Sequence, residues 1–299
     1  MIACAIRYFL LLLVVPVTQG YNPASSWRCR DSFVAIDSKG TALTWGALSS
    51  SNDNVRSVFS HKSAIAYLLD SGEVETVNED TNIYLTNIEH IYSTESAFVA
   101  LDADHTIYCW GNEEEGGDCH GVESENVDYV VCGFAACAAL YFDGTVSAWG
   151  DDTVGGYDIA LTGVSRIWAG GYAFVAMYYD GSISCWGDAE YGGDCYDTNT
   201  AIDGGMATVR EIYASKFAFV MVSEEGSVYP WGSSSFGGSL QESSWYDGTG
   251  LSSVTKVYTN ELAMCAVSST LETNSINLES HFINCWGFGS YGGQTDGYD

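Results

Sequence analysis

Ser96 to Asp118 reads SAFVALDADHTIYCWGNEEEGGD, and the same pattern returns from Tyr172 to Asp194 as YAFVAMYYDGSISCWGDAEYGGD. Five further copies begin near residues 32, 63, 135, 217 and 262. The Trp-Gly tryptophan of each copy, replaced by Val77 in the second, falls at 45, 77, 110, 149, 186, 231 and 286. The copies are therefore 32 (45 to 77) to 55 (231 to 286) residues apart. Repeats at this spacing predict stacked or radial units that bury their apolar surfaces against one another.

Each unit has the composition of short β-strands. Its apolar runs are rich in Val, Ile, Phe and Tyr and are bounded by Gly and Asp, and no window shows a 3.6-residue period long enough for a helix. Acidic-Gly pairs such as Asp143-Gly144 and Asp180-Gly181 supply the positive φ of a tight hairpin, and His105 takes that place in the third copy. In the fourth unit we expect strands at about 127–132, 136–141 and 145–149.

The A-F-V-A-L runs are apolar on both faces, which favours sheets that are covered on both sides. We therefore predict an all-β fold, a seven-bladed β-propeller of four-stranded antiparallel blades. The first and seventh units should touch, because an open array would expose two sheet faces. The Trp-Gly tryptophans should pack between blades rather than stack on a sugar, at Trp45, Trp110, Trp149, Trp186, Trp231 and Trp286.

Residues 1–20 have the pattern of a secretory signal. Arg7 precedes an apolar run from Tyr8 to Val17, and Thr18 and Gly20 lead to an expected cleavage before Tyr21. The run is shorter than the roughly 20 residues of a transmembrane helix, and no later segment approaches that length. We predict a secreted chain, residues 21–299, that forms one propeller domain without a membrane span.

The chain is strongly acidic, with a formal net charge of -29, and its lysines occur only at 39, 62, 216 and 256. Such a charge repels nucleic acid and anionic membranes, so nucleic-acid binding is excluded. The acidity either serves solubility or attracts cations or a basic partner, and composition leaves both readings open.

The cysteines indicate local disulfides. Cys109 with Cys119 and Cys185 with Cys195 share a ten-residue spacing at the same place in the repeat. Zinc is disfavoured, because no CxxC or HxxxH spacing occurs. An odd number of cysteines is left after signal removal, so at least one thiol is free or joins another chain. Their pairing is left open at Cys29, Cys132, Cys137, Cys265 and Cys285.

From about Trp27 to Gly293 the units resemble the regulator of chromosome condensation repeat, whose order is apolar strand, acidic-Gly turn, alternating strand, Trp-Gly and a Gly-rich loop. The resemblance implies a seven-bladed β-propeller. The chain departs from the family after Trp-Gly, where the usual Asn-x-x-Gly-Gln-Leu-Gly is reduced to GG or GGD. The family's nucleotide-exchange activity on a nuclear GTPase and its nucleosome binding do not transfer, because this chain has a signal sequence and few basic residues.

Catalytic motifs are missing from the sequence. The five histidines are scattered, and there is no HExxH, G-x-S-x-G or phosphate-binding glycine loop. A carboxylate pair of the glycosidase kind is not excluded among 39 acids. The stretch from Asp197 to Gly204 is loosely similar to a calcium loop, but it lacks the Gly at position 6 and the Glu at position 12. We expect no cofactor, with calcium as the open alternative.

These observations favour a non-enzymatic, monomeric binding module for a protein partner or divalent cations. An extracellular carbohydrate-active enzyme or lectin is the alternative. In an up-and-down blade the loop after Trp-Gly and the loop before A-F-V-A-L emerge together, opposite the Asp-Gly turns. We expect the partner at the first of these ends, on Glu113, Glu114, Glu115, Asp151, Asp152 and Asp188, with Trp245 and Tyr246 as aromatic anchors.

Overall fold

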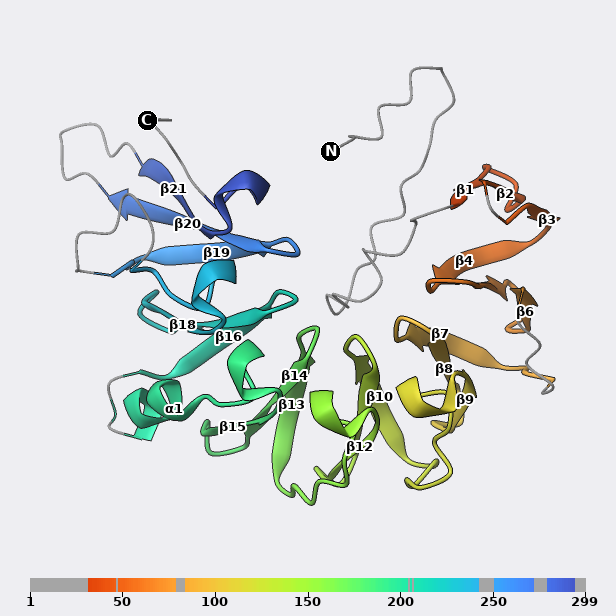
Figure 1. Cartoon of the computed structure of the whole chain (residues 1–299), viewed down its shortest axis with the longest axis horizontal. Helices are drawn as coiled ribbons and strands as arrows, with labels where there is room; N and C mark the ends of the chain where they lie inside the picture. Colours follow the sequence, from red (N-terminus) through yellow and green to blue (C-terminus); the bar gives the residue numbers. More distant parts are fainter. Residues whose placement is uncertain are drawn as a thin grey trace.

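The computed structural model describes residues 32–46, 48–78, 84–203, 205, 207–241, 250–271 and 279–293. They form seven antiparallel sheets, or blades, arranged side by side (Figure 1). Blades 1 to 3 contain β1 (Ser32–Ile36), β2 (Ala42–Gly46), β3 (Ser50–Asn52); β4 (Val55–Ser60), β5 (Ile65–Leu69), β6 (Val74–Val77); β7 (Ile88–Ser93), β8 (Ala97–Asp102), β9 (Ile107–Gly111). Blades 4 and 5 contain β10 (Val127–Cys132), β11 (Ala136–Tyr141), β12 (Val146–Gly150); β13 (Val164–Ala169), β14 (Ala173–Tyr178), β15 (Ile183–Gly187). Blades 6 and 7 contain β16 (Val209–Ala214), β17 (Ala218–Ser223), β18 (Val228–Gly232); β19 (Val254–Thr259), β20 (Ala263–Leu271), β21 (Glu279–Gly287).

The fold class is the predicted one, an all-β propeller arrangement of seven blades. The middle strands β5, β8, β11 and β17 are buried at every position, because each lies in a sheet covered on both faces. In the fourth unit the strands fall at Val127–Cys132, Ala136–Tyr141 and Val146–Gly150, as predicted to within one residue. His105 has a φ of 63°, which confirms it as a left-handed turn residue.

The prediction of four strands per blade is wrong for the described residues, where every sheet has three. In blade 1 the strand β3 pairs with the Trp45 strand β2, whereas in blades 3 and 4 irregular chain occupies the edge that a fourth strand would pair with. In blade 4 the irregular chain forms a single β-bridge with the third strand, between Leu161 and Val146. In blade 3 the irregular chain accepts one backbone hydrogen bond, from the Ile107 N–H to the Ser124 carbonyl at 2.9 Å. The segments after the GG loops therefore cover the third strand without forming a ladder.

One short helix was not expected from the sequence. α1 (Tyr196–Asp203) is eight residues long and follows blade 5. It contains most of the segment that is similar to a calcium loop, so the backbone there is helical rather than looped. Its brevity explains the wrong prediction, since two turns give too few apolar positions for a helical period. Among the described residues no helix is long and apolar enough to cross a membrane.

Neighbouring blades are joined by two series of backbone hydrogen bonds, one at each end of their strands. In blades 2 to 7 we call the turns between first and second strands the inner turns (61–64, 94–96, 133–135, 170–172, 215–217 and 260–262), because they point toward the middle of the arc in Figure 1. They form a continuous series of N–H to carbonyl bonds of 2.7–3.0 Å: Lys62 to Glu95, Glu95 to Phe134, Phe134 to Gly171 and Gly171 to Lys216. This series fixes the inner turns of blades 2 to 6 relative to one another.

The acidic-Gly turns form the second series. We call them the outer turns (37–41, 70–73, 103–106, 142–145, 179–182 and 224–227), because they lie on the outside of the arc (Figure 1). The glycine carbonyl of one blade accepts from the first strand of the next, as Gly144 does from Val164 at 2.9 Å and Gly226 from Val254 at 3.0 Å. The two series together hold blades 2 to 5 to one another at both ends, and each remaining pair of neighbouring blades is joined at one end.

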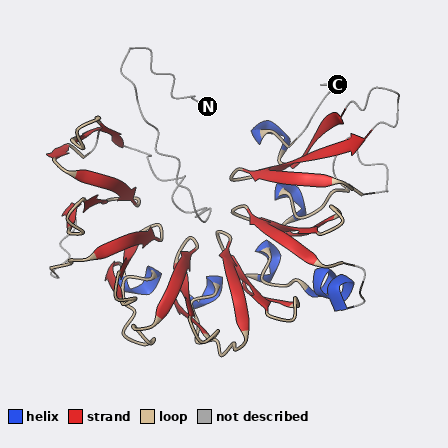
Figure 2. Ribbon diagram, turned by 180° about the vertical axis from the view of Figure 1, so that it is seen from behind, coloured by secondary structure: helices blue, strands red, loops and turns tan. Residues whose placement is uncertain are grey.

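Among the described residues the expected contact between the first and seventh units is not present, since Figures 1 and 2 show an open arc with blades 1 and 7 at its two ends. The outward faces of the end blades are exposed as a result. Leu43 in blade 1 is 52% exposed and Tyr258 in blade 7 is 55% exposed, although both are large apolar residues.

Candidate binding surface

The loop after the Trp-Gly of blades 3 to 7 is a short 3-10 turn. The turns are η1 (Glu113–Glu115), η2 (Asp152–Val154), η3 (Ala189–Tyr191), η4 (Ser234–Phe236) and η5 (Gly289–Tyr291). At the residue before the turn, the side chains of Asn112, Asp151 and Asp188 accept the backbone N–H two positions later. We call these loops, 112–117, 151–156, 188–193, 233–238 and 288–293, the capped turns. Asp151 and Asp188 thus serve as N-caps of their own loops.

Each capped turn ends in two positions that require glycine for different reasons. The first, such as Gly116, has a left-handed φ of 102°. The second, such as Gly193, folds back on the strand end, so that an added Cβ would lie 2.5 Å from the carbonyl oxygen of Gly187. Close backbone approach therefore explains the GG pair that replaces the longer family loop.

Four of the five glycine pairs also hold the tryptophan of the following blade. The indole N–H groups of Trp149, Trp186 and Trp231 donate at 3.1 Å to the carbonyls of Gly116, Gly155 and Gly192, and Trp286 donates to Gly237 at 2.8 Å. All four tryptophans are buried. The structure thus places them between blades, where the sequence reasoning expected them.

Trp110 and Trp45 differ, in ways that follow from their neighbours. Trp110 is buried, but its indole N–H meets no acceptor among the described residues. The preceding unit has Val77-Asn78 and no GG loop to supply one. Trp45 lies in the first blade of the arc and is 44% exposed, so it is not buried between blades.

The capped turns and the inner turns lie at the same end of each blade. The first N–H of a capped turn donates at 2.9 Å to the inner turn of its own blade, as Asn112 does to Ser96, Asp151 to Ala135, Asp188 to Tyr172 and Ser233 to Phe217. Glu113, Glu114, Asp152 and Glu190 are exposed there. The structure therefore gathers these acids at the inner end, opposite the outer turns. Trp245 and Tyr246 lie outside the described residues.

An aromatic stripe runs along this inner end from blade 4 to blade 7. Its seven rings contact one another in series at centroid distances of 4.8–5.7 Å. They come from the inner turns (Phe134, Tyr172, Phe217) and from the capped turns (Tyr191, Phe236, Phe288, Tyr291). None of the seven is fully buried, and Phe288 and Tyr291 are 41% and 52% exposed. The stripe is thus a half-exposed apolar surface among the acids.

Lys216 lies on the covered part of the stripe. Its ammonium is 5.1 Å from the ring centroid of Phe134 and 5.3 Å from that of Phe217, within the range of a cation–π contact. The same ammonium donates to the Glu261 carboxylate at 3.2 Å, and the side chain is only 13% exposed. A cation is therefore held here by aromatic faces together with a carboxylate.

The stripe lies in a negative field. Burial raises the pKa of Tyr172, and the negative charges of Glu95, Glu261 and Asp188 raise it further. These three acids belong to blades 3, 7 and 5, so the convergence of inner ends brings them near one ring. Removing a proton from Tyr172 would add a further negative charge, which explains the direction of the shift. The sign of this field favours a cationic ligand.

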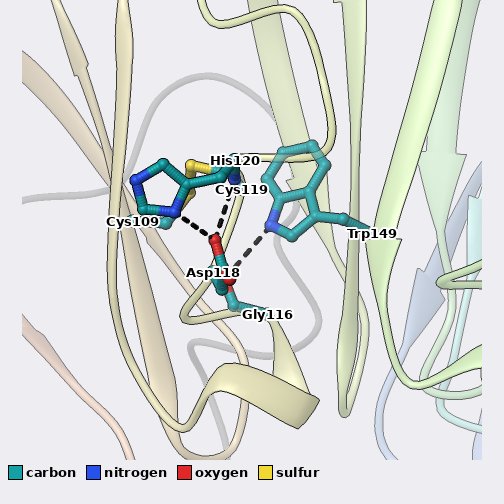
Figure 3. Close-up of polar contacts among 6 residues, drawn as sticks. All are labelled: Cys109, Gly116, Asp118, Cys119, His120 and Trp149. Atoms are coloured by element: carbon teal, nitrogen blue, oxygen red, sulfur yellow. Dashed lines mark hydrogen bonds and ion pairs between the residues drawn. A yellow bond between two sulfur atoms is a disulfide. The ribbon is translucent and has the colours of Figure 1, made fainter.

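Disulfides fasten the chain beyond the capped turns. Cys109–Cys119 and Cys185–Cys195 are the two pairs predicted from the spacing, and each joins a third strand, β9 or β15, to the segment after GGD. Figure 3 shows the first beside the bond from Trp149 to Gly116. Two more pairs, Cys132–Cys137 and Cys265–Cys285, join directly opposite residues of adjacent strands. Cys29 lies outside the described residues.

Asp118 and His120 are hydrogen-bonded to each other in the loop that Figure 3 shows. The Asp118 carboxylate accepts the backbone N–H of His120 at 2.9 Å and contacts the imidazole Nδ1 at 2.5 Å. These bonds, the backbone one first, lower the pKa of Asp118. Because the His120 side chain is 97% exposed, the pair stabilises a surface loop and offers no enclosed reaction site.

A metal site and a glycosidase acid each place requirements on the side chains that form them. They contain no group of three or more His, Cys, Asp or Glu side chains placed to hold a metal ion. The carboxyl groups with a shifted pKa, at Asp37, Glu73, Asp118, Asp143 and Asp180, are all lowered by hydrogen bonds in exposed turns. A glycosidase acid requires a raised pKa instead.

The aromatic stripe was missed by the sequence reasoning, although a signal was present. An aromatic residue directly precedes the A-F run at Tyr172 and Phe217, Phe134 lies one position earlier in its own unit, and another aromatic residue precedes GG at Tyr191, Phe236 and Tyr291. Each position alone is typical of a loop. Only their convergence at the inner ends of blades 4 to 7 makes them a surface.

The fold thus defines the class of molecule as a seven-bladed, all-β propeller with an open ring and an acidic, aromatic inner end. No family model and no curated protein matches the sequence. Similar solved structures include the ectodomain of the Physcomitrella patens receptor kinase CR4, which is 15% identical with a TM-score of 0.48 over 90% of this chain and 71% of that one. Prp20p from Saccharomyces cerevisiae is 15% identical with a TM-score of 0.44 over 69% and 70% of the two chains. The ectodomain of the Arabidopsis thaliana receptor kinase ACR4 is 14% identical with a TM-score of 0.44 over 68% and 76%.

Proposed function

We propose that this protein is a secreted, non-enzymatic binding module that receives a basic patch of a partner protein at the inner ends of its blades. The observation that carries the proposal is that the aromatic stripe and the exposed acids of the capped turns share one end of the blades. An apolar surface among carboxylates suits a partner that brings both aliphatic stems and positive charge. The scarcity of basic residues agrees with a site that receives its cations from outside.

Protein binding is favoured over binding of a divalent cation. Asp151 and Asp188 are engaged as N-caps, and the exposed acids are spread over capped turns of different blades. A divalent ion needs several oxygen ligands within about 2.6 Å of one point, whereas a basic surface can meet dispersed charges.

The test compares two charge variants of equal size. The inner variant changes Glu113, Glu114, Glu115, Asp151 and Asp152 to amides, and the outer variant changes five exposed acids of the outer turns, Asp70, Asp104, Asp143, Glu224 and Glu225. The immobilised proteins capture partners from the native extracellular fluid at increasing salt. We expect the inner variant to lose the salt-sensitive partners and the outer variant to keep them. Loss with the outer variant alone would contradict the proposal.

Both variants should fold. An Asn at position 151 can cap η2 as Asn112 caps η1, and surface substitutions of this kind change stability by about 0.5 kcal/mol each at most. Thermal unfolding followed by circular dichroism checks this before capture is compared.

A carbohydrate-binding role is the second candidate, because half-exposed Tyr and Phe rings also stack on sugars. The same capture experiment separates the two. Elution by soluble glycans at unchanged ionic strength would support a lectin, whereas elution by salt supports the protein-binding proposal.

A further inference from the structure

The aromatic stripe has a covered part and an exposed part with related chemistry. On the covered part, Phe134 and Phe217 face the ammonium of Lys216, which also donates to Glu261. On the exposed part, Phe288 contacts both Phe236 and Tyr291, at 5.7 Å between centroids in each case. Phe217 joins the two parts, because its ring is 4.8 Å from that of Phe236. The protein's own lysine therefore shows which ligand such rings accept.

The exposed part is held in place by the fold. Phe288 is the residue before η5, and its N–H donates to the Leu262 carbonyl at 2.9 Å. The Tyr291 N–H donates to the Phe288 carbonyl at 2.9 Å, and its carbonyl accepts from the Asn260 side chain at 2.8 Å. Both rings thus project from a capped turn fastened to the inner turn of blade 7, where Glu261 also lies. A rigid aromatic anchor costs little entropy to use in binding.

We infer that the exposed part of the stripe, Phe236, Phe288 and Tyr291, is the docking site for an arginine or lysine side chain of the partner. This inference rests on the proposed function and names the chemistry that the partner must supply. The cation lies against the ring faces as Lys216 does, and Glu261 lies on the inner turn to which η5 is bonded. Arginine suits the site best, because its planar guanidinium stacks on aromatic faces and is less strongly hydrated than an ammonium.

A pair of matched peptides tests the inference. The probe is a fluorescein-labelled heptapeptide, Gly-Arg-Gly-Arg-Gly-Arg-Gly, and its control carries citrulline, which has the shape of arginine without the charge, at the three positions. Fluorescence polarisation measures binding to the full chain at low salt. We expect the arginine peptide to bind at least tenfold more tightly than the citrulline peptide. Equal binding of the two peptides, or no arginine-peptide binding at millimolar protein, would overturn the inference.

Substitutions then locate the peptide. Phe288→Leu with Tyr291→Leu removes two ring faces and keeps apolar volume, and should weaken the arginine peptide about fivefold to thirtyfold. The matched control is Tyr179→Leu, a 74% exposed tyrosine of an outer turn, which should bind as the wild type does. Both positions are exposed, so neither variant disturbs the core. Unchanged binding in the double variant would also overturn the inference.

The experiments distinguish a failure of this inference from a failure of the proposed function. If the inner charge variant loses its partner while the double leucine variant keeps both partner and peptide, the inner end binds protein but the rings do not hold its cation. If the inner charge variant keeps its partner, the proposed function itself fails.

Discussion

Hydrogen bonds from tryptophan indole N–H groups connect successive blades. In four blades the tryptophan donates backward to a glycine carbonyl of the preceding capped turn. A hydrogen bond of this kind contributes about 1 kcal/mol net, and an unmatched buried carbonyl costs about 1–3 kcal/mol. The exception at Trp110 makes the contribution measurable, because the ring is buried there without the bond.

We predict that Trp231→Phe lowers the free energy of unfolding by about 1–2 kcal/mol more than Trp110→Phe does. Both substitutions remove a similar volume beside a stacked phenylalanine, Phe219 or Phe98, but only the first leaves a carbonyl, that of Gly192, without its donor. Urea unfolding followed by tryptophan fluorescence gives the comparison. Equal losses at the two positions would show that the indole bond does not hold the blades together.

Residue-level reasoning from the sequence succeeded where the repeat enforces one environment. Trp149, Trp186, Trp231 and Trp286 recur at one position and are buried alike. It failed for Trp45, because the spacing cannot show that the first blade lacks a preceding neighbour. It also treated Asp151 and Asp188 as free acids, although each is an N-cap.

Elements of the blades were predictable up to the third strand. The alternating pattern and the acidic-Gly turns give the hairpins, since period-2 burial and positive φ are local properties. The edge beyond the third strand depends on the segments after GG, which differ in length and composition between units. Blade 3 covers this edge with a disulfide-linked segment, and blade 4 covers it with one bridge at Leu161.

We predict that removing the Cys109–Cys119 bridge by serine substitution opens this edge in blade 3. The free energy of unfolding should fall by about 2–3 kcal/mol in the chain-entropy model. The amide of Ile107, which donates to Ser124, should exchange with solvent faster, because its acceptor lies just beyond the bridged segment.

The Val146 amide is the internal control for this exchange measurement. It donates to Leu161 in the equivalent place of blade 4 and should keep its rate. Hydrogen exchange followed by mass spectrometry or NMR reports both amides in one sample. Acceleration at Val146 as well as Ile107 would indicate that the bridge supports the whole molecule rather than one edge.

In the whole molecule, hydrogen bonds that recur from unit to unit build one continuous surface. Two series of backbone bonds and the indole bonds place every capped turn at the inner end, so acids and rings far apart in sequence share one side of the arc. The number of blades followed from counting repeats. The open ring did not, because closure depends on the rotation between packed sheets, which no single unit encodes.

Photo-cross-linking tests the central claim, that partners bind at the inner end, most directly. A photoreactive phenylalanine analogue replaces Glu190, an exposed acid of η3 at the inner end, or Tyr179, an exposed tyrosine of the outer turn in the same blade. Each protein is irradiated with the partners captured from the native fluid. We expect cross-links from position 190, to segments rich in arginine or lysine, and none from position 179. Cross-links to the same partners from position 179 and not from 190 would contradict the account.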